Sequence, residues 1–315
     1  MTALRTAVVG AGYLGRFHAE KHRALEDVAL VGVCDIDPER GRAVAEAVGT
    51  RYFADHRELI GLVDAVTIAA STSAHFELAK CFLENDVHVL VEKPITRTSA
   101  EALELAELAE ERGLKLQVGH VERFNPALVA ARESLSDVRF VECHRLAPFK
   151  PRGADVNVVL DLMIHDLDVI LSLLSSAPVE VSAIGTAVLT DTVDIANARI
   201  TFANGATANV TASRVSTSEQ RRFRVFQPRL YVSMDFGRNE LRRVRSRGAG
   251  EPLEEERIDL QKTDALLAET RAFVDAVRND APCPVTGRDG VAALELAEAV
   301  IADIERRAGG PLAWV

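Results

Sequence analysis

The feature that most constrains how this chain folds is a glycine-rich turn close to its N-terminus. An apolar stretch over residues 6–9 predicts a buried strand, the pattern Gly10-x-Gly12-x-x-Gly15 follows, and a predicted helix continues to residue 25. Gly10 permits a tight turn, Gly12 lets a diphosphate approach the backbone, and Gly15 lets the helix pack closely on the strand. The phosphates would bind the free N–H groups and the positive dipole of the helix N-terminus.

An acidic residue after the second predicted strand gives this turn its context. That strand covers residues 28–34 and is followed by Asp35, twenty residues after Gly15. A carboxylate there can bind both ribose hydroxyls of NAD and would repel the additional phosphate of NADP. The alternative is a glycine turn without a ligand, which leaves the following strand and acid unexplained. We expect NAD as the cofactor, although Arg40 and Arg42 lie nearby in sequence and could weaken the discrimination.

Length and composition favour an ordinary soluble chain of two domains. The chain has 315 residues, of which 27% are charged and 48% hydrophobic, and its net charge is −10. The acidic balance argues against a nucleic-acid surface, and no apolar run is long enough to cross a membrane. The four cysteines have no metal or redox spacing, so we expect free thiols, no metal site and a cytoplasmic location.

The order of predicted elements indicates an α/β fold in two domains. Strands and helices alternate over residues 1–119, which predicts a parallel sheet with a ligand crevice at its C-terminal strand ends. Residues 120–315 hold an apolar helix over 156–174 and then several strands, including a hairpin around Asn204-Gly205. This predicts an α+β domain with an open, largely antiparallel sheet, one face of which could be covered by a second subunit.

Two groups of residues could carry a reaction. Lys93 follows the apolar strand 87–91 and could serve as an acid or base, or could be an ordinary surface lysine. Asp161 and His165 lie one turn apart in the helix 156–174, on a polar stripe with Asp168 and Ser172. The acid could orient the imidazole for proton transfer, or the stripe could be the wet edge of a helix.

The segment after the last strand of the first domain could hold a polar substrate. Glu122, Arg123 and Asn125 lie at the predicted domain junction, where clefts often form. The alternative is a capped helix start at Asn125-Pro126, and both readings could be correct. Five arginines are candidates for an anionic ligand on charge alone, although most are expected to be solvated residues of the sheet: Arg152, Arg221, Arg222, Arg224 and Arg229.

Taken together, these motifs resemble the Gfo/Idh/MocA oxidoreductase family over essentially the whole chain. The resemblance rests on the glycine turn, on Glu92-Lys93-Pro94, on the Asp161-x-x-x-His165 pair and on residues 284–290. It implies a Rossmann domain, a second domain with an open sheet used in oligomer contacts, and a catalytic group formed by Lys93, Asp161 and His165. The chain departs from the family pattern at Met163, where glycine is common, and at Ser73, where proline is common.

The resemblance also implies which residues contact the ligands. The expected cofactor contacts are Gly10, Gly12, Tyr13, Leu14, Asp35, Ser71, Thr72, His75, Glu92 and Lys93. The expected substrate contacts are Lys93, Glu122, Arg123, Asn125, Asp161 and His165.

Within the family, residues 118–126 and 159–166 are most similar to dehydrogenases that oxidise the 3-hydroxyl of UDP-N-acetylglucosamine. Such a product could serve lipid A or surface polysaccharide synthesis. The alternatives are a dehydrogenase of a free cyclitol or aldose, and a redox-cycling NAD-dependent glycosidase. A homodimer or homotetramer is expected in each case.

Overall fold

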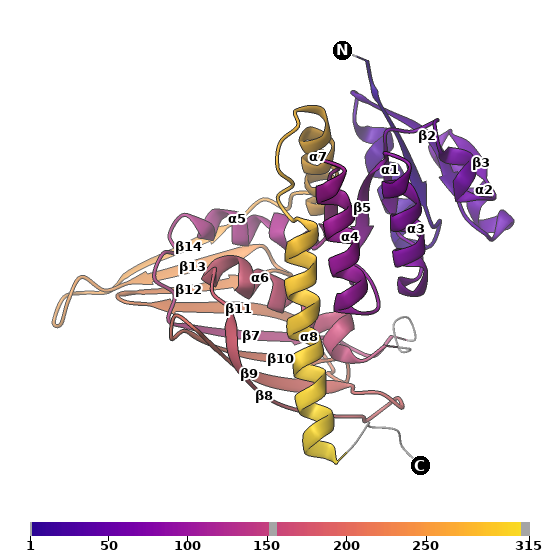
Figure 1. Ribbon diagram of the computed structural model, residues 1–315. Coiled ribbons are helices and arrows are strands. Elements are labelled where there is room, and N and C mark those ends of the chain that lie inside the picture. The colour runs from indigo at the N-terminus through magenta and orange to yellow at the C-terminus, as the bar shows by residue number, and fades with distance from the viewer. Residues whose placement is uncertain (1, 151–155, 310–315) are drawn as a thin grey trace. The chain divides into compact units, whose positions relative to one another are not determined.

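The computed structural model describes residues 2–150 and 156–309 and divides the chain into two compact units (Figure 1). Unit 1 comprises Met1–Val121 and Asp264–Val291, and unit 2 comprises Glu122–Thr263 and Ala292–Val315. The sequence predicted one boundary, between residues 119 and 120, but the segment Asp264–Val291 joins the first unit. The reason is helix α7 (Ala265–Arg278), which buries Phe273 and Val274 among apolar residues of unit 1 such as Leu90 and Leu25.

Unit 1 is built on a six-stranded parallel sheet with the strand order β3-β2-β1-β4-β5-β6. Its central strand β4 is buried at every position, as expected for a parallel sheet between helices. The strands are β1 (Leu4–Val9), β2 (Val28–Cys34), β3 (Arg51–Phe53), β4 (Ala65–Ile68), β5 (His88–Glu92) and β6 (Leu116–Gly119). The helices, besides α7, are α1 (Tyr13–Ala24), α2 (Pro38–Val48), α3 (Thr72–Glu84) and α4 (Ser99–Glu111).

Unit 2 is built on an eight-stranded sheet with the order β14-β13-β12-β11-β7-β10-β9-β8. Its named pairs are antiparallel except that of β10 with β7, which confirms the largely antiparallel prediction. The strands are β7 (Phe140–Leu146), β8 (Pro178–Thr186), β9 (Ile195–Phe202), β10 (Thr207–Ser213), β11 (Gln220–Gln227), β12 (Leu230–Asp235), β13 (Glu240–Arg245) and β14 (Glu254–Asp259). The helices are α5 (Pro126–Arg132), α6 (Ile164–Leu174) and α8 (Gly287–Ala308), of which α8 begins in unit 1.

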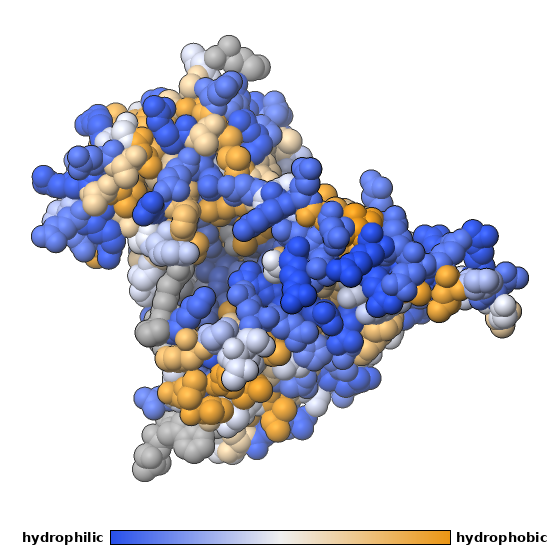
Figure 2. All heavy atoms as spheres, turned by 180° about the vertical axis from the view of Figure 1, so that it is seen from behind, coloured by the Kyte–Doolittle hydropathy of each residue, from blue (hydrophilic) through white to orange (hydrophobic). Residues whose placement is uncertain are grey.

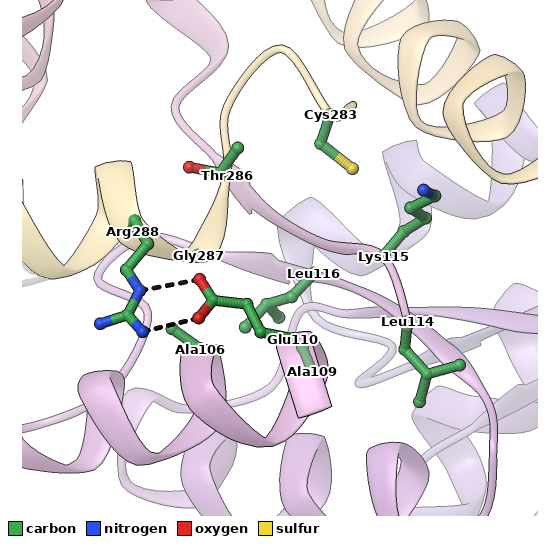
Figure 3. Close-up of a pocket in the computed structure, with 10 residues that line it drawn as sticks. All are labelled: Ala106, Ala109, Glu110, Leu114, Lys115, Leu116, Cys283, Thr286, Gly287 and Arg288. Atoms are coloured by element: carbon green, nitrogen blue, oxygen red, sulfur yellow. Dashed lines mark hydrogen bonds and ion pairs between the residues drawn. The ribbon is translucent and has the colours of Figure 1, made fainter. Parts of the chain in front are cut away.

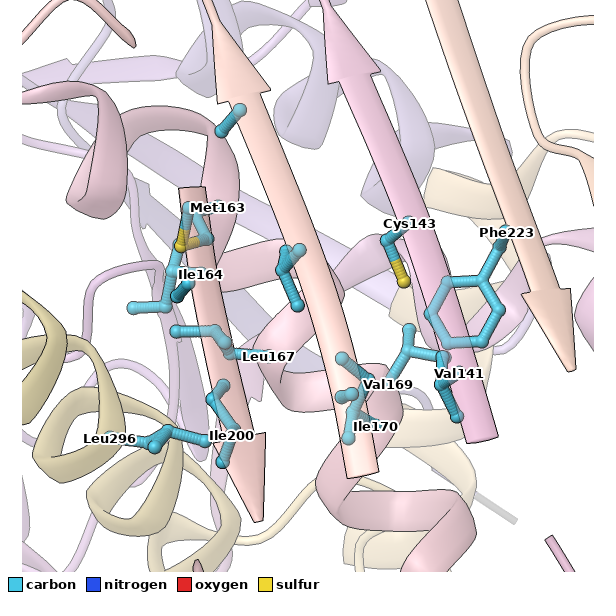
Figure 4. Close-up of a cluster of buried hydrophobic side chains, with 14 of the residues drawn as sticks. Val141, Cys143, Met163, Ile164, Leu167, Val169, Ile170, Ile200, Phe223 and Leu296 are labelled. Atoms are coloured by element: carbon cyan, nitrogen blue, oxygen red, sulfur yellow. The ribbon is translucent and has the colours of Figure 1, made fainter. Parts of the chain in front are cut away.

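One face of this second sheet forms the core of unit 2. Val141, Cys143 and Phe223 point from β7 and β11 into a cluster with side chains of α6, such as Leu167 and Ile170 (Figure 4). The alternate residues of the same strands point to the opposite face, where the Phe226 ring lies 5.5 Å from Phe140 and 5.0 Å from Tyr231. This second face is therefore a mixture of aromatic and polar side chains.

One face of the molecule is mainly hydrophilic. Figure 2 shows hydrophilic side chains over most of one face of the molecule, with hydrophobic side chains gathered in separate patches. Among residues 2–150 and 156–309, no helix has both the length and the apolar character needed to cross a bilayer. The four cysteines are free thiols, and Cys34, Cys143 and Cys283 are buried.

Candidate active site

The glycine turn of unit 1 has the geometry that a dinucleotide requires. Gly10 has a φ of +96°, and a side chain on it would lie 2.6 Å from the backbone nitrogen of Ala70. A side chain on Gly15 would overlap the carbonyl oxygen of Gly10, whereas the position of a side chain on Gly12 is open space. Gly12 also caps α1, whose first turn has no acidic residue and no side-chain cap. The turn therefore offers the N-terminus of α1 and room for a diphosphate.

Asp35 lies beside this turn, and its carboxylate is already heavily hydrogen-bonded. Oδ2 accepts the N–H of Ala11 at 2.6 Å and Nε of Arg40 at 3.1 Å, and Oδ1 accepts the N–H of Asp37 at 2.8 Å and Nη2 of Arg40 at 2.7 Å. Burial opposes the charge on Asp35, but these bonds, led by Arg40, outweigh it and lower the pKa. Because a carboxylate has about four acceptor positions, Arg40 must yield before ribose hydroxyls can bind. Ile36, which is 93% exposed, follows directly and offers an apolar surface to a base.

The N-terminus of α3 carries the next predicted cofactor contacts. Ser71 is its N-cap residue, makes no side-chain cap hydrogen bond, and precedes Thr72 at the helix start. His75 is buried, with Nδ1 2.9 Å from the carbonyl oxygen of Pro94 and Nε2 3.1 Å from that of Ala70. Burial lowers the pKa of His75 and so favours the neutral ring. A neutral ring has one N–H, so His75 donates to one of these two backbone carbonyls.

The Glu92-Lys93-Pro94 turn ends strand β5. The Lys93–Pro94 peptide bond is cis, Glu92 is buried and Lys93 is half-buried. The Lys93 N–H donates to Glu92 Oε2 at 3.2 Å. This places Lys93 at the C-terminal edge of the parallel sheet, the edge at which folds of this type bind ligands.

Asp161 and His165 belong to unit 2, where the structure corrects the prediction of one regular helix. Val159–Met163 forms a π-helical turn, and α6 begins only at Ile164. The Asn157 side chain accepts the N–H groups of Val159 and Leu160, both at 3.1 Å, and so fixes the start of the turn. π-Helical turns are rare and occur mostly at functional sites. Asp161 and His165 are both half-buried.

The predicted substrate contacts Glu122, Arg123 and Asn125 are engaged within unit 2. Arg123 forms two bonds to Asp168, at 2.6 and 2.8 Å. Asn125 accepts the N–H of Ala127 at 3.0 Å and so caps α5, which is the alternative that the sequence left open. Its amide nitrogen also lies 3.1 Å from Glu122 Oε2. These side chains therefore have structural partners, whatever else they contact.

Sequence reasoning missed Arg145, which joins Glu122 to a second acid, Asp166. It is buried on β7 and donates to Glu122 at 2.8 Å and to Asp166 at 2.9 Å through both Nε and Nη2. Burial opposes the charge on Arg145, but the two carboxylates outweigh it and raise its pKa. A signal was available in retrospect, because Arg145 follows Val141 and Cys143 in strict alternation and therefore must face inward.

The strand register shows on which face of the sheet some of the candidate arginines lie. Arg221 pairs with Arg145 and therefore lies on the same face of the sheet. Arg222 and Arg224 lie on the opposite face, since the side chains of a strand alternate. Arg229 lies in the turn between β11 and β12, and Arg152 lies outside the described residues.

A separate cavity of about 170 Å³ lies in unit 1 between α4, β6 and the start of α8 (Figure 3). Leu114, Leu116 and Cys283 line it, and Arg288 forms two bonds to Glu110 at its edge, at 2.8 and 2.6 Å. None of the predicted site residues is among those that line it.

Comparison with known proteins identifies the family. A family model for the oxidoreductase family with an NAD-binding Rossmann fold matches residues 4–120, and one for the GFO/IDH/MocA C-terminal domain matches residues 129–232.

Two individual proteins resemble this chain over nearly its full length, at different levels of sequence identity. A UDP-N-acetylglucosamine 3-dehydrogenase of Acidithiobacillus ferrooxidans is 42% identical over 97% of this chain and 100% of its own length. Its solved structure covers 97% of this chain and 99% of its own, with a TM-score of 0.92. An inositol 2-dehydrogenase of Rhizobium meliloti is 26% identical over 96% of this chain and 98% of its own. The chain therefore belongs to the Gfo/Idh/MocA family of NAD-binding oxidoreductases.

Proposed function

We propose that this protein oxidises the 3-hydroxyl of a UDP-N-acetylhexosamine to a ketone, with NAD as the oxidant. The observation that carries the proposal is the 42% identity, over nearly the full length of both chains, to an enzyme named for that reaction. The inositol dehydrogenase is more distant at 26%, which makes a free cyclitol the second candidate substrate.

The proposed mechanism divides the work between the units. NAD, when bound, supplies the hydride acceptor. The Gly10–Gly15 turn binds its diphosphate and Asp35 its ribose, with Ser71 and Thr72 at the neighbouring helix start. Lys93 and His165 take or share the proton of the substrate hydroxyl, and Asp161 orients His165. Positioning of the reacting groups supplies much of the rate.

The remaining substrate contacts are assigned to unit 2. Arg221 is our candidate for the diphosphate, because it lies on the same sheet face as Arg145 and is 44% exposed at its side chain. The contacts predicted for Glu122, Arg123 and Asn125 stay predictions. Their internal bonds suit a rigid pocket wall, since side chains held by neighbours keep their geometry when a substrate binds.

The biological setting follows from the proposed product. A 3-keto nucleotide sugar could be converted by an aminotransferase for lipid A or a surface polysaccharide. We also propose a homodimer or homotetramer through the second sheet, whose aromatic face around Phe226 is suited to burial against another copy. A cytoplasmic location stays a prediction.

A substrate panel with NAD tests the proposal. UDP-N-acetylglucosamine, UDP-N-acetylgalactosamine, UDP-glucose, myo-inositol and glucose are each followed by nicotinamide absorbance, together with a chromogenic glycoside. We expect turnover of the UDP-N-acetylhexosamines, and transfer of label to the reduced cofactor from substrate deuterated at C3. Retention of that label in the sugar would contradict oxidation at C3. Oxidation of myo-inositol alone would favour the cyclitol enzyme, and glycoside cleavage without net reduction would favour the glycosidase.

A further inference from the structure

Three buried ionisable side chains of unit 1 meet next to the Lys93 turn. His18 comes from α1, Glu92 from the end of β5 and Glu269 from α7, and their nitrogen and oxygen atoms lie within 4.8 Å of one another. Their exposed fractions are 0%, 7% and 0%. Removing charged groups from water this completely is costly unless they are paired, so the cluster calls for an explanation.

The contacts of Glu92 connect His18 to the backbone of Lys93. His18 Nε2 lies 2.7 Å from Glu92 Oε1, and Glu92 Oε2 accepts the Lys93 N–H at 3.2 Å. His18 lies three residues after Gly15, in the helix whose N-terminus forms the dinucleotide cradle. One side chain therefore ties the cradle helix to the turn that carries Lys93.

The neighbouring strand leaves the Glu92 carboxylate little freedom. A side chain on Gly119 would lie only 3.0 Å from Glu92 Oε2, so strand β6 closes that side. The side-chain amide of Gln117, also on β6, donates to the backbone carbonyl of Glu269 at 3.2 Å and holds α7 in place. The orientation of Glu92 is thus set by packing on one side and by His18 on the other.

The charges of the cluster agree with this arrangement. Burial opposes ionisation of Glu92, but its interactions with His18 and Lys93 together outweigh it, so the pKa of Glu92 is lowered. Glu92 is therefore an anion at neutral pH, with His18 as its hydrogen-bond partner.

A metal ion is the competing explanation for two carboxylates and an imidazole. Ligand bonds of about 2.0–2.2 Å would hold two donor atoms of one metal roughly 3 Å or more apart. The 2.7 Å separation of His18 Nε2 and Glu92 Oε1 is instead that of a charge-assisted hydrogen bond.

We propose that His18 is a positioning residue for Lys93. It fixes the Glu92 carboxylate and thereby keeps the Lys93 turn in register with the helix that binds the dinucleotide. The inference rests on the role assigned to Lys93 in the proposed function.

The chain provides a matched control one helical turn away. His22 is equally buried on α1, and its Nε2 lies 2.8 Å from Thr67 Oγ1 rather than near Glu92. We compare His18→Gln and Glu92→Gln with His22→Gln in the full-length protein. The first readout needs no substrate: trace acetylation of Lys93 at pH 8, measured by peptide mass spectrometry relative to Lys80, which pairs with Glu104.

We expect acetylation of Lys93 to become at least roughly threefold faster in Glu92→Gln, because an amide does not stabilise the ammonium, and to change by a similar factor in His18→Gln. His22→Gln should leave it unchanged. With an active substrate, His18→Gln should lower kcat by about tenfold to a hundredfold, with a nearly unchanged Kd for NAD.

Several outcomes would overturn the inference. Acetylation and kcat of His18→Gln equal to those of His22→Gln would do so, and so would a stoichiometric divalent metal, detected by mass spectrometry, that is lost in His18→Gln. If His18→Gln does not unfold cooperatively, the rate of Lys93 acetylation in Glu92→Gln is used instead to test the inference. A wild-type protein inactive on every nucleotide sugar, but with the expected acetylation pattern, would refute the proposed substrate and leave the role of His18 standing.

Discussion

One buried cluster of each unit holds its charges in a different way. In unit 2, buried acids pair with arginines: Glu122 and Asp166 with Arg145, and Asp194 with Arg214 at 2.6 Å. In unit 1, the buried acid Glu92 pairs with a histidine. Arginine stays charged at every physiological pH, whereas imidazole titrates near neutrality. The clusters of unit 2 are therefore permanent supports, while the buried imidazole of His22 makes unit 1 sensitive to protons.

The largest expected effect tests the proton sensitivity of unit 1. Burial, together with the charge of His18, lowers the pKa of His22 from 6.5 to about 3. The folded protein keeps this ring neutral while the unfolded chain takes up a proton below pH 6.5. Stability is therefore lost as pH falls from 6.5 towards 3, by up to about 5 kcal/mol, and by about 2 kcal/mol at pH 5.

Hydrogen exchange of unit 1 peptides in urea, at pH 7.5 and pH 5, measures this loss. His22→Gln should be less stable than wild type at pH 7.5 but should show a flatter pH dependence. Parallel pH curves for the two proteins would show that the contrast between the units does not lie in His22.

The second prediction concerns the permanent ion pairs of unit 2. Arg145→Met leaves two carboxylates, Glu122 and Asp166, buried without their counter-ion. We expect the free energy of unfolding of unit 2 to fall by about 3–5 kcal/mol. Adding Glu122→Gln and Asp166→Asn to the same variant should recover much of the loss. Exchange rates of peptides from β7 provide the measurement, and a loss below about 1 kcal/mol would mean that the cluster is more hydrated than its burial indicates.

The third prediction separates function from stability. Lys93→Ala should lower kcat by roughly two to four orders of magnitude, because a proton-transfer group is removed. The thermal midpoint should change little, since Lys93 is only half-buried. If the variant keeps a kcat near that of the wild type on the identified substrate, Lys93 is an ordinary loop lysine and not a proton-transfer group.

A smaller effect is expected at the ribose site. Arg40 occupies the Asp35 carboxylate and could also attract the additional phosphate of NADP. Arg40→Gln should therefore raise the preference for NAD over NADP by about tenfold, the value of one charge-assisted bond. The ratio of kcat/KM for the two cofactors reports it, and an unchanged ratio would show that Arg40 contacts neither cofactor.

The smallest effect on stability is expected for an exposed ion pair, which serves as a comparison for the buried pairs. Arg288 bonds to Glu110 through two nitrogens, as Arg145 does to Asp166, but both side chains are about half exposed (Figure 3). Such pairs contribute little because water screens them. Arg288→Met should leave the thermal midpoint unchanged within error, and a clear loss would mean that burial is not what distinguishes the clusters.

The fold was predictable wherever the signal is local. The glycine turn, the alternating elements of unit 1 and the Asn204-Gly205 hairpin each depend on residues close in sequence, and the structure contains all of them. The strands β7 and β8 were missed. In β7 a buried charge, Arg145, stands where a hydrophobic residue would have completed the pattern. In β8, Pro178 begins the strand and exposed apolar residues such as Ile184 blur the alternation.

The site was predictable in its residue types but not in its connections. Asp166 binds Arg145, a partner that lies 21 residues away on a strand that the sequence analysis did not predict. The bonds of Arg123 to Asp168, 45 residues away, and of His18 to Glu92, 74 residues away, depend on tertiary placement in the same way. The π-helical turn at Val159–Met163 could not be predicted from the sequence either, because its residues fit an ordinary apolar α-helix equally well.

The return of α7 to unit 1 has a consequence for synthesis on the ribosome. The N-terminal segment up to residue 121 emerges first, but Phe273 and Val274 arrive only after the whole of 122–263 has been made. Until then Leu90 and Leu25 lack some of their apolar packing partners. The nascent unit should therefore expose hydrophobic surface that chaperones can bind. A fragment that ends at residue 121 should aggregate when it is expressed. A fusion that joins 264–291 directly to residue 121 should not.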